Sequence, residues 1–315
     1  MAMDFWEAQR RARKQTAVYL VLFALLTLAA AFLAELGIRY VAQDQYNPPW
    51  PFFGTLFVAL TFTVALFQYW WFSFTGGRCV AEILGGRRAN GSDLKEAQLL
   101  HIVNECAVAS SLPVPQTYII RGDSINAFAA GLSADKAIIA ITSGALHKLS
   151  REELQGVIAH EFGHIKNGDM RIGLRLAALI MGFYFILYLG FRMLQFSGRS
   201  DGGGSRNSGK NVLLLASLVF LCAGALTWLF GSILKACVSR QREYLADASS
   251  VQFTRNPHGL ANALRKILNE PKKAMPKTGM AYSHLYLDDR SWVSSIFATH
   301  PPLQKRIEAI EGHSL

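Results

Sequence analysis

Four long apolar runs constrain the fold of this chain more than any other feature. They cover residues 17–34, 52–74, 172–196 and 212–238. Each meets the length of roughly 20 residues that an α-helix needs to cross a bilayer. Helices satisfy their backbone hydrogen bonds internally, which a lipid environment requires. The sequence therefore predicts four transmembrane helices, and the alternative of buried core helices fits these lengths less well.

Basic residues flank the apolar runs and predict their orientation. Four of them precede the first run, whereas residues 36–51 contain one, Arg39. Because basic residues favour the cytoplasmic side, both termini and residues 76–171 are expected there. The loop 197–211 carries three basic residues and is the exception, since four spans place it outside. The first run is longer than the apolar part of a signal peptide, which favours an uncleaved anchor over a cleaved leader.

The runs divide the chain into four parts. Residues 1–75 hold the N-terminal flank and two transmembrane helices, and residues 76–171 form a soluble part. Residues 172–238 form a transmembrane hairpin with a Gly-rich outer loop, and residues 239–315 form a second soluble part. The net charge is +10, but the basic residues are scattered beside apolar runs. This pattern favours a lipid surface over nucleic acid as the partner.

Periodicity and turn residues predict a mixed architecture for the soluble parts. Helices are expected over residues 93–111 and 143–148, over a motif-bearing segment that begins near residue 150, and over residues 239–250, 258–268 and 301–311. Strands are expected over residues 117–121, 127–130 and 136–142. Residues 269–298, with Pro271, Pro276 and Gly279, are expected to be irregular. The predicted class is mostly α, as an α+β fold with a small sheet.

A five-residue motif in the first soluble part carries the chemistry. Residues 160–164 read His-Glu-Phe-Gly-His, the H-E-x-x-H pattern of zinc-dependent hydrolases. Two histidines four residues apart lie on one face of a helix, where both imidazoles reach one metal ion. Glu161 then lies beside the metal and can take a proton from a bound water.

The helix that carries the motif has a clear predicted start and one unusual residue. Ser150, followed three residues later by Glu153, is typical of a capping box. Gly163 within the motif lowers helix stability. Either another segment approaches it closely, such as a substrate strand or a second helix, or the glycine is a tolerated weakness.

A catalytic zinc ion usually takes three protein ligands, so a third one is needed. Glu243 is the best candidate. His164 lies about eight residues before the third apolar run, and Glu243 lies about five residues after the fourth. An antiparallel hairpin brings both to the same membrane face, on the order of 10 Å above the bilayer edge at 1.5 Å per residue. Glu152, Asp169 and Asp247 are the alternatives.

Asp247 and His300 are further candidates. Asp247 follows Glu243 by four residues and shares its helix face. Metal-bound imidazoles usually donate their other N–H to a carboxylate, so Asp247 either orients His160 or is a surface carboxylate. His300 precedes two prolines in a rigid loop, and the residue pattern alone leaves its role open.

Taken together, these motifs resemble the HtpX family of membrane zinc metallopeptidases, which is related to the CAAX prenyl proteases. The resemblance extends from the first apolar run to about Glu311. It rests on four segments in order: residues 125–128 (Ile-Asn-Ala-Phe), 160–164, 242–247 (Arg-Glu-Tyr-Leu-Ala-Asp), and 299–302 (Thr-His-Pro-Pro) with Arg306. CAAX prenyl proteases typically have more spans, so four favour the HtpX branch. The Gly-rich loop 197–210 looks longer than this family needs.

The resemblance implies one zinc ion held by His160, His164 and Glu243, with Glu161 as the general base. It also implies that His300 approaches the metal centre and helps to stabilise the developing oxyanion.

Two further expectations come from the resemblance. Arg306 is expected to approach the metal centre as well. Asn126, Ala127 and Phe128 are expected on a strand that borders the cleft, where an extended polypeptide adds to an open sheet edge.

The resemblance implies four transmembrane helices and a zincin-like cytoplasmic domain that contains the small sheet and the H-E-x-x-H helix. The implied function is a zinc metalloendopeptidase of a bacterial inner membrane. It hydrolyses peptide bonds of membrane or misfolded proteins at the cytoplasmic face, in quality control. Two alternatives are a CAAX-type prenyl-protein processing protease and a non-enzymatic membrane scaffold with a structural zinc. The sequence does not determine the oligomeric state.

Overall fold

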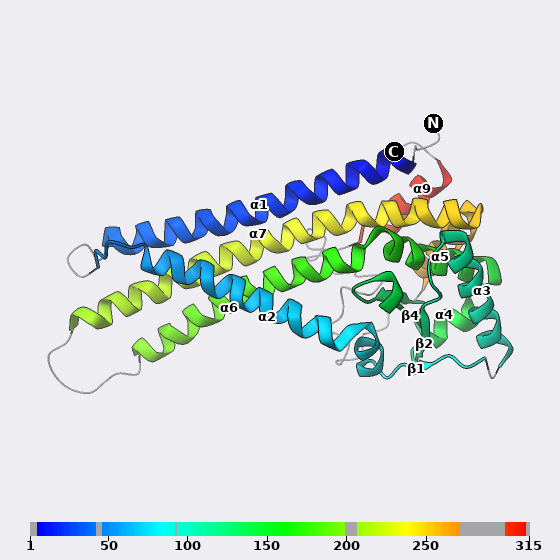
Figure 1. Ribbon diagram of the computed structural model, residues 1–315, viewed down its shortest axis with the longest axis horizontal. Helices are drawn as coiled ribbons and strands as arrows, with labels where there is room; N and C mark the ends of the chain where they lie inside the picture. Colours follow the sequence, from blue (N-terminus) through cyan, green and yellow to red (C-terminus); the bar gives the residue numbers. More distant parts are fainter. Residues whose placement is uncertain (1–4, 42–45, 92, 199–206, 271–299, 313–315) are drawn as a thin grey trace. The chain divides into compact units, whose positions relative to one another are not determined.

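The computed structural model describes residues 5–41, 46–91, 93–198, 207–270 and 300–312. The chain forms two compact units. The helical unit comprises residues 16–71 and 174–235, and the mixed unit comprises residues 1–15, 72–173 and 236–315. Four helices run through both units (Figure 1): α1 (Phe5–Val41), α2 (Phe52–Ile83), α6 (Asp169–Gly198) and α7 (Asn207–Thr254).

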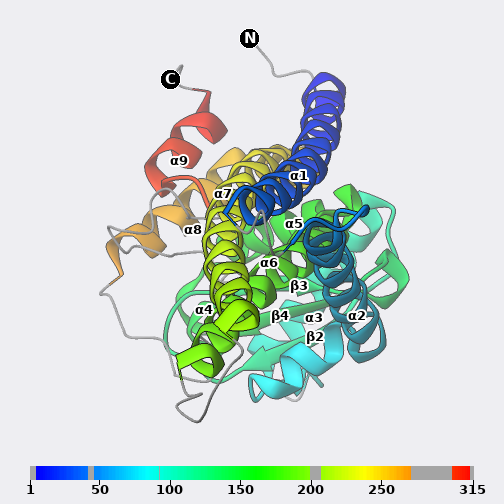
Figure 2. The same ribbon diagram turned by 90° about the vertical axis from the view of Figure 1, so that its left-hand side faces the viewer.

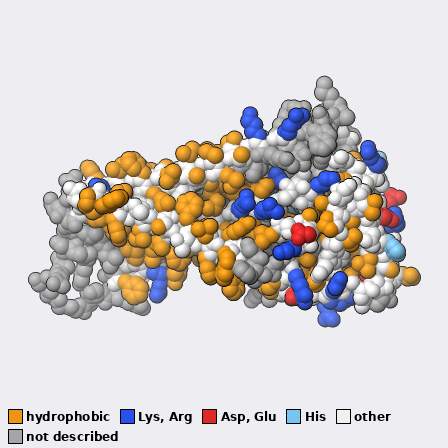
Figure 3. Space-filling view, viewed as in Figure 1, with side chains coloured by type: hydrophobic (Ala, Val, Ile, Leu, Met, Phe, Trp, Pro, Cys, Tyr) orange, Lys and Arg blue, Asp and Glu red, His pale blue; other side chains and the backbone are white. Residues whose placement is uncertain are grey.

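The helical unit matches the sequence pattern. Its helices belong to four candidate spans, Ala17–Tyr40, Phe52–Trp71, Asp169–Phe196 and Leu214–Thr254, each long and apolar enough to cross a membrane. The last two spans extend into the mixed unit, at residues 169–173 and 236–254. Figure 3 shows hydrophobic side chains over much of the visible face of these helices. The exposed large apolar residues of the unit include Leu25, Phe32, Leu33, Leu66 and Phe67. Such a surface suits contact with lipid tails rather than water. The prediction of four apolar helices is confirmed.

Small residues let the helices of this unit pack closely. Ala31, Phe57, Ile186 and Phe220, one from each helix, form a buried cluster. A Cβ atom added at Gly190 would lie 2.6 Å from the backbone nitrogen of Leu221, so glycine permits backbone contact between α6 and α7 there. This is the usual means of association for helices in lipid, where no hydrophobic effect drives packing.

The mixed unit contains a four-stranded sheet in the order β1-β2-β4-β3. Its strands are β1 (Arg87–Arg88), β2 (Gln116–Ile120), β3 (Ala127–Ala130) and β4 (Ile138–Thr142). β2 and β4 are parallel, whereas β1–β2 and β3–β4 are antiparallel. The predicted strands are present, but β4 begins two residues later than expected because Ala134–Lys136 forms a 3₁₀ turn. β1 is too short to leave a sequence signal.

Among its described residues, this unit has five further helices: α3 (Leu94–Ser110), α4 (Ser143–Lys148), α5 (Arg151–Asn167), α8 (Pro257–Asn269) and α9 (Leu303–Glu311). α5 contacts α3, α8 and β3, and α9 packs against α8 (Figure 2). The expected irregular segment lies almost wholly outside the described residues, since 271–299 are not among them. The helix that was expected over residues 239–250 is the unbroken end of α7, which continues to Thr254.

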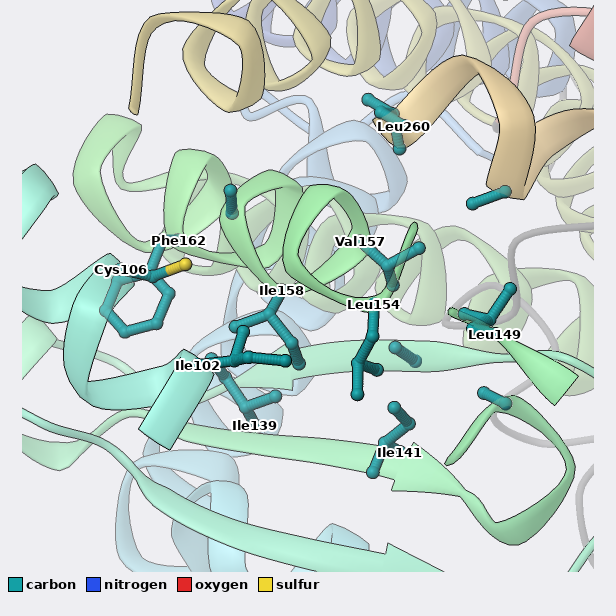
Figure 4. Packing of buried hydrophobic residues seen from close by; sticks show 14 of the residues in the cluster. Ile102, Cys106, Ile139, Ile141, Leu149, Leu154, Val157, Ile158, Phe162 and Leu260 are labelled. Carbon is teal, nitrogen blue, oxygen red and sulfur yellow. The ribbon is translucent and has the colours of Figure 1, made fainter. Parts of the chain in front are cut away.

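The core of the mixed unit fixes α5 on the sheet. Leu154, Ile158 and Phe162 of α5 are buried, together with Ile139 and Ile141 of β4. Figure 4 shows Ile158 beside Ile139, Leu154 above Ile141, and Phe162 beside Cys106 of α3. Burying one such side chain contributes roughly 1.5–3 kcal/mol. The apolar face of α5 is therefore held firmly, which leaves its other side available to the motif histidines.

Candidate metal centre

The limits of α5 are set by its own sequence. Ser150 Oγ accepts a hydrogen bond from Glu153 N at 3.3 Å, and Glu153 Oε2 accepts one from Ser150 N at 2.7 Å. The predicted capping box is therefore confirmed. At the other end, Gly168 has φ 70°, a left-handed conformation that glycine adopts without strain, and its N–H bonds to His164 and Ile165 carbonyls. α6 starts at the next residue.

Gly163 lies where α5 meets α7. A Cβ atom at this position would stand 3.0 Å from Cα and O of Ala246 and from Cβ of Ser249. Nearby, Ser250 Oγ donates to the Gly156 carbonyl at 2.7 Å. The structure thus supports one of the interpretations open from the sequence: the glycine allows a second helix to approach.

We expect Gly163→Ala to lower both the thermal midpoint and the rate of proteolysis. Alanine favours a helix by up to about 1 kcal/mol over glycine. Overpacking of a tight contact costs about 1–3 kcal/mol, and it moves α7 relative to the motif histidines. Gly173→Ala is the matched control, because a Cβ there meets nothing within 4 Å. Equal melting and activity in both variants would show that the contact at Gly163 does not matter.

Three predicted ligands converge in the structure. Nε2 of His160 and Nε2 of His164 are 3.2 Å apart. Oε2 of Glu243 lies 3.7 Å from the first nitrogen, and Oε1 lies 3.4 Å from the second. One donor atom from each residue falls within 4.8 Å of the others, so the group can hold a metal ion. The long helix α7 does return the chain to the motif of α5, as the hairpin argument predicted.

The donor set fits zinc. Two imidazole nitrogens and one carboxylate are a usual ligand set for a catalytic zinc ion with a fourth position left open. Nε2 of His300 is buried and has no hydrogen-bond partner among the described residues. Buried polar atoms are nearly always bonded, so this nitrogen indicates a site built for a further group.

The electrostatics also favour a cation. Burial lowers the pKa of His164, but Asp169 and Glu243 raise it more, so the pKa lies well above the ordinary value for histidine. The surrounding carboxylates therefore outweigh the cost of burying positive charge.

Asp247 and Arg306 form a buried network behind the ligands. Oδ1 of Asp247 lies 2.9 Å from Nδ1 of His160, the place of a carboxylate that orients a metal-bound imidazole. Arg306 is 0% exposed and donates to both oxygens of Asp247, at 2.9 and 2.7 Å. Its Nη1 is 3.0 Å from Oε2 of Glu243. Burial lowers the pKa of Arg306, yet the two carboxylates raise it above its usual range, so the guanidinium stays charged.

His300 and Glu161 complete the group. Nδ1 of His300 is 3.0 Å from Oε2 of Glu243, which places this ring at the ligand cluster as expected. Glu161 is buried on α5, next to His160 in sequence. Of the alternative third ligands, Glu152 is exposed in the first turn of α5, about two turns from His160.

Asp169 is the carboxylate whose place the sequence did not indicate. Its Oδ2 lies 2.8 Å from Nδ1 of His164, on the side of the ring away from Nε2. Its other oxygen accepts from Arg242 of α7. From the sequence, Asp169 was a candidate ligand, whereas the structure places its carboxylate against the far nitrogen of a ligand, Nδ1 of His164. The sequence did offer one indication of this place, because Asp169 directly follows Gly168, the glycine that ends the motif helix.

Residues 126–128 lie on the edge of the sheet. β3 pairs only with β4 among the described strands and contacts α5. Thr142 N donates to Asn126 O at 3.0 Å. Because bonding alternates along an antiparallel pair, the main-chain groups of Ala127 and Ala129 face away from β4. The Phe128 side chain is buried in a separate cluster with Tyr118 and Ile138, so it is the main chain of β3 that borders the edge away from β4.

Comparison with known proteins places these features in a family. The model of peptidase family M48 matches residues 93–314, which include every residue of the metal centre. The chain belongs to peptidase family M48. With four helices long and apolar enough to cross a membrane, it is a membrane-protein member of this family.

Relatives within family M48 agree. A protease HtpX homolog of Ligilactobacillus salivarius is 41% identical over 228 residues, which cover 70% of this chain and 76% of the relative. One of Streptococcus uberis is 40% identical over 234 residues, covering 72% and 77%. The chain is thus an HtpX-type M48 peptidase. The crystal structure of S. mikatae Ste24p covers 94% of this chain and 67% of its own, with TM-score 0.51 and 17% identity, and so shares the fold.

Proposed function

We propose that this M48 peptidase is a zinc metalloendopeptidase that hydrolyses peptide bonds of membrane or misfolded proteins at the cytoplasmic face of a bacterial inner membrane. The convergence of His160, His164 and Glu243 around one point carries the proposal. The similarity to bacterial proteins named as proteases supports the class of reaction. The distribution of basic residues supports the orientation. The role in quality control rests on the resemblance to the HtpX family.

The chemistry follows from the placement of the side chains. His160, His164 and Glu243 would hold a zinc ion, which when bound would supply Lewis acidity to the scissile carbonyl and to the attacking water. Glu161 takes the proton of the attacking water and passes it to the leaving amine. His300, next to the ligand cluster, donates to the oxyanion that develops on the carbonyl oxygen.

Arg306 fits a positioning role better than direct contact with substrate. It is fully buried and is bound on one side by Asp247 and on the other by Glu243. Its charge offsets those two carboxylates, which otherwise repel each other one helical turn apart.

The sheet edge suits an extended polypeptide. The outward N–H and C=O groups of Ala127 and Ala129 offer a substrate backbone the bonds of an added strand. Such main-chain recognition is independent of the substrate side chains, which fits the cleavage of many different unfolded proteins. Ala127 and Ala129 are themselves buried, so strand addition requires that neighbouring groups give way.

Metal removal tests the proposal. We expect a chelator to abolish cleavage of casein by the full chain in detergent, and added zinc to restore it. Unmodified and prenylated peptides assayed in parallel separate general proteolysis from CAAX-type processing, which requires a strong preference for the prenylated substrate. Zinc binding without any peptidase activity would favour the structural-zinc alternative. Proteolysis that persists without metal would refute the zinc mechanism.

A further inference from the structure

Each motif imidazole is backed by its own carboxylate and its own arginine. His160 faces Asp247, which binds Arg306, and His164 faces Asp169, which binds Arg242. We propose that Asp169 and Arg242 are a positioning pair for His164, and that they hold its ring so that Nε2 faces the other two ligands. This inference rests on the proposed metal centre.

Asp169 and Arg242 lie on the Nδ1 side of the His164 ring, away from the other two ligands. Oδ2 of Asp169 lies 2.8 Å from Nδ1 of His164. Its Oδ1 accepts from Nε and Nη2 of Arg242, and Nη2 also donates to the carbonyl of Asn167 at 2.6 Å. A carboxylate at Nδ1 fixes the proton there and leaves Nε2 free to bind a metal.

The pair is buried, so each member depends on the other. The side chain of Asp169 is 8% exposed and that of Arg242 is 5% exposed. A buried charge without its partner is costly, whereas the fork of arginine satisfies a carboxylate with fixed geometry. Arg242 thus holds the carboxylate of Asp169 in one orientation, and through it the imidazole.

The pair and the histidine that it contacts come from three different helices, α5, α6 and α7. Asp169 is the first residue of α6, directly after the turn that ends α5, and Arg242 precedes Glu243 on α7. Consecutive residues of α7 therefore act on His164 from both sides, one as the neighbouring ligand and one through Asp169. An ion pair that only joined two helices would not need a carboxylate oxygen in contact with Nδ1 of His164.

Zinc affinity separates positioning from mere stability. Loss of a carboxylate behind a ligating histidine typically weakens metal binding about 10- to 100-fold. We therefore expect this loss in Asp169→Asn, measured on the full chain in detergent by competition with a chromophoric chelator. The absorption spectrum of bound Co²⁺ should change with it, because the ring that coordinates the ion is no longer fixed.

Glu311→Gln is the matched control. Glu311 accepts from Arg265 and joins α9 to α8 as a carboxylate–arginine pair, but it touches no residue of the metal centre. We expect wild-type zinc affinity and an unchanged Co²⁺ spectrum in this variant, whatever its thermal midpoint.

Further variants make the test decisive. Arg242→Lys keeps the charge but not the fork, and we expect an intermediate zinc affinity even if Asp169→Asn does not fold. Asp169→Asn combined with Arg242→Gln should be no weaker than Asp169→Asn alone, since the two act as one unit. Wild-type zinc affinity in Asp169→Asn or Arg242→Lys would overturn the pair, as would additive losses. A wild-type chain that binds no zinc would instead remove the metal centre itself.

Discussion

Replacing Glu161 by glutamine is expected to abolish peptide-bond hydrolysis while zinc stays bound. Glutamine keeps the shape of this buried side chain but does not accept a proton. The three ligands His160, His164 and Glu243 are untouched. Loss of a general acid–base group lowers the rate by about 10²- to 10⁴-fold. Casein cleavage in detergent, measured together with zinc per chain, gives both quantities from one preparation.

The control for this experiment lies on the same helix. Glu152 is exposed in the first turn of α5, so Glu152→Gln removes the same charge outside the cluster. We expect nearly full activity and full zinc content from it. Full activity in Glu161→Gln would remove the general-base assignment. Loss of zinc in that variant would mean that Glu161 supports the metal directly.

The second large effect is expected at Glu243. Glu243→Ala removes one of three ligands, and we expect zinc content to fall from about one ion per chain to near none, with loss of proteolysis. The substitution also deprives Arg306 and His300 of a carboxylate 3.0 Å away. Breaking a buried pair from one side costs about 3–5 kcal/mol, so a lower thermal midpoint should accompany the loss of metal.

Glu243→Gln separates these two consequences. It keeps the volume and one oxygen of the side chain, so it tests the ligand with less damage to packing. Glu105→Ala is the control, because this exposed carboxylate of α3 pairs with Arg151 away from the centre. Unchanged zinc stoichiometry in both Glu243 variants would point to another third ligand, with His300 the first to examine.

The local features of the motif helix were predictable from the sequence because they depend on residues close together along the chain. The capping box needs only Ser150 and Glu153, and the shared face of the two histidines follows from helical spacing. Glu243 was also predictable from the sequence. The third and fourth apolar runs form a hairpin, and both His164 and Glu243 lie only a few residues beyond it, so they must be close to the same end of the hairpin. What Gly163 contacts was not predictable, since the sequence alone does not say which element faces it.

The partners of the ligands required tertiary structure. Arg306 reaches Asp247 only because α9 packs against α8 and brings a residue 59 positions away into the core. Asp169 was open to interpretation as a ligand until the side of the His164 ring that it faces was known. β1 has only two residues, too few for a period-2 pattern, so its pairing with β2 could not be predicted from the sequence.

The buried Arg306 has a consequence for biosynthesis. It touches a carboxylate of the ligand set and lies 3.4 Å from Nε2 of a histidine 146 positions earlier in the chain. The motif helix is therefore translated long before Arg306, whose guanidinium balances the charges of Glu243 and Asp247. The buried network is therefore completed only after all four apolar helices have been synthesised, and a chain that ends before Arg306 leaves Glu243 and Asp247 without this counter-charge.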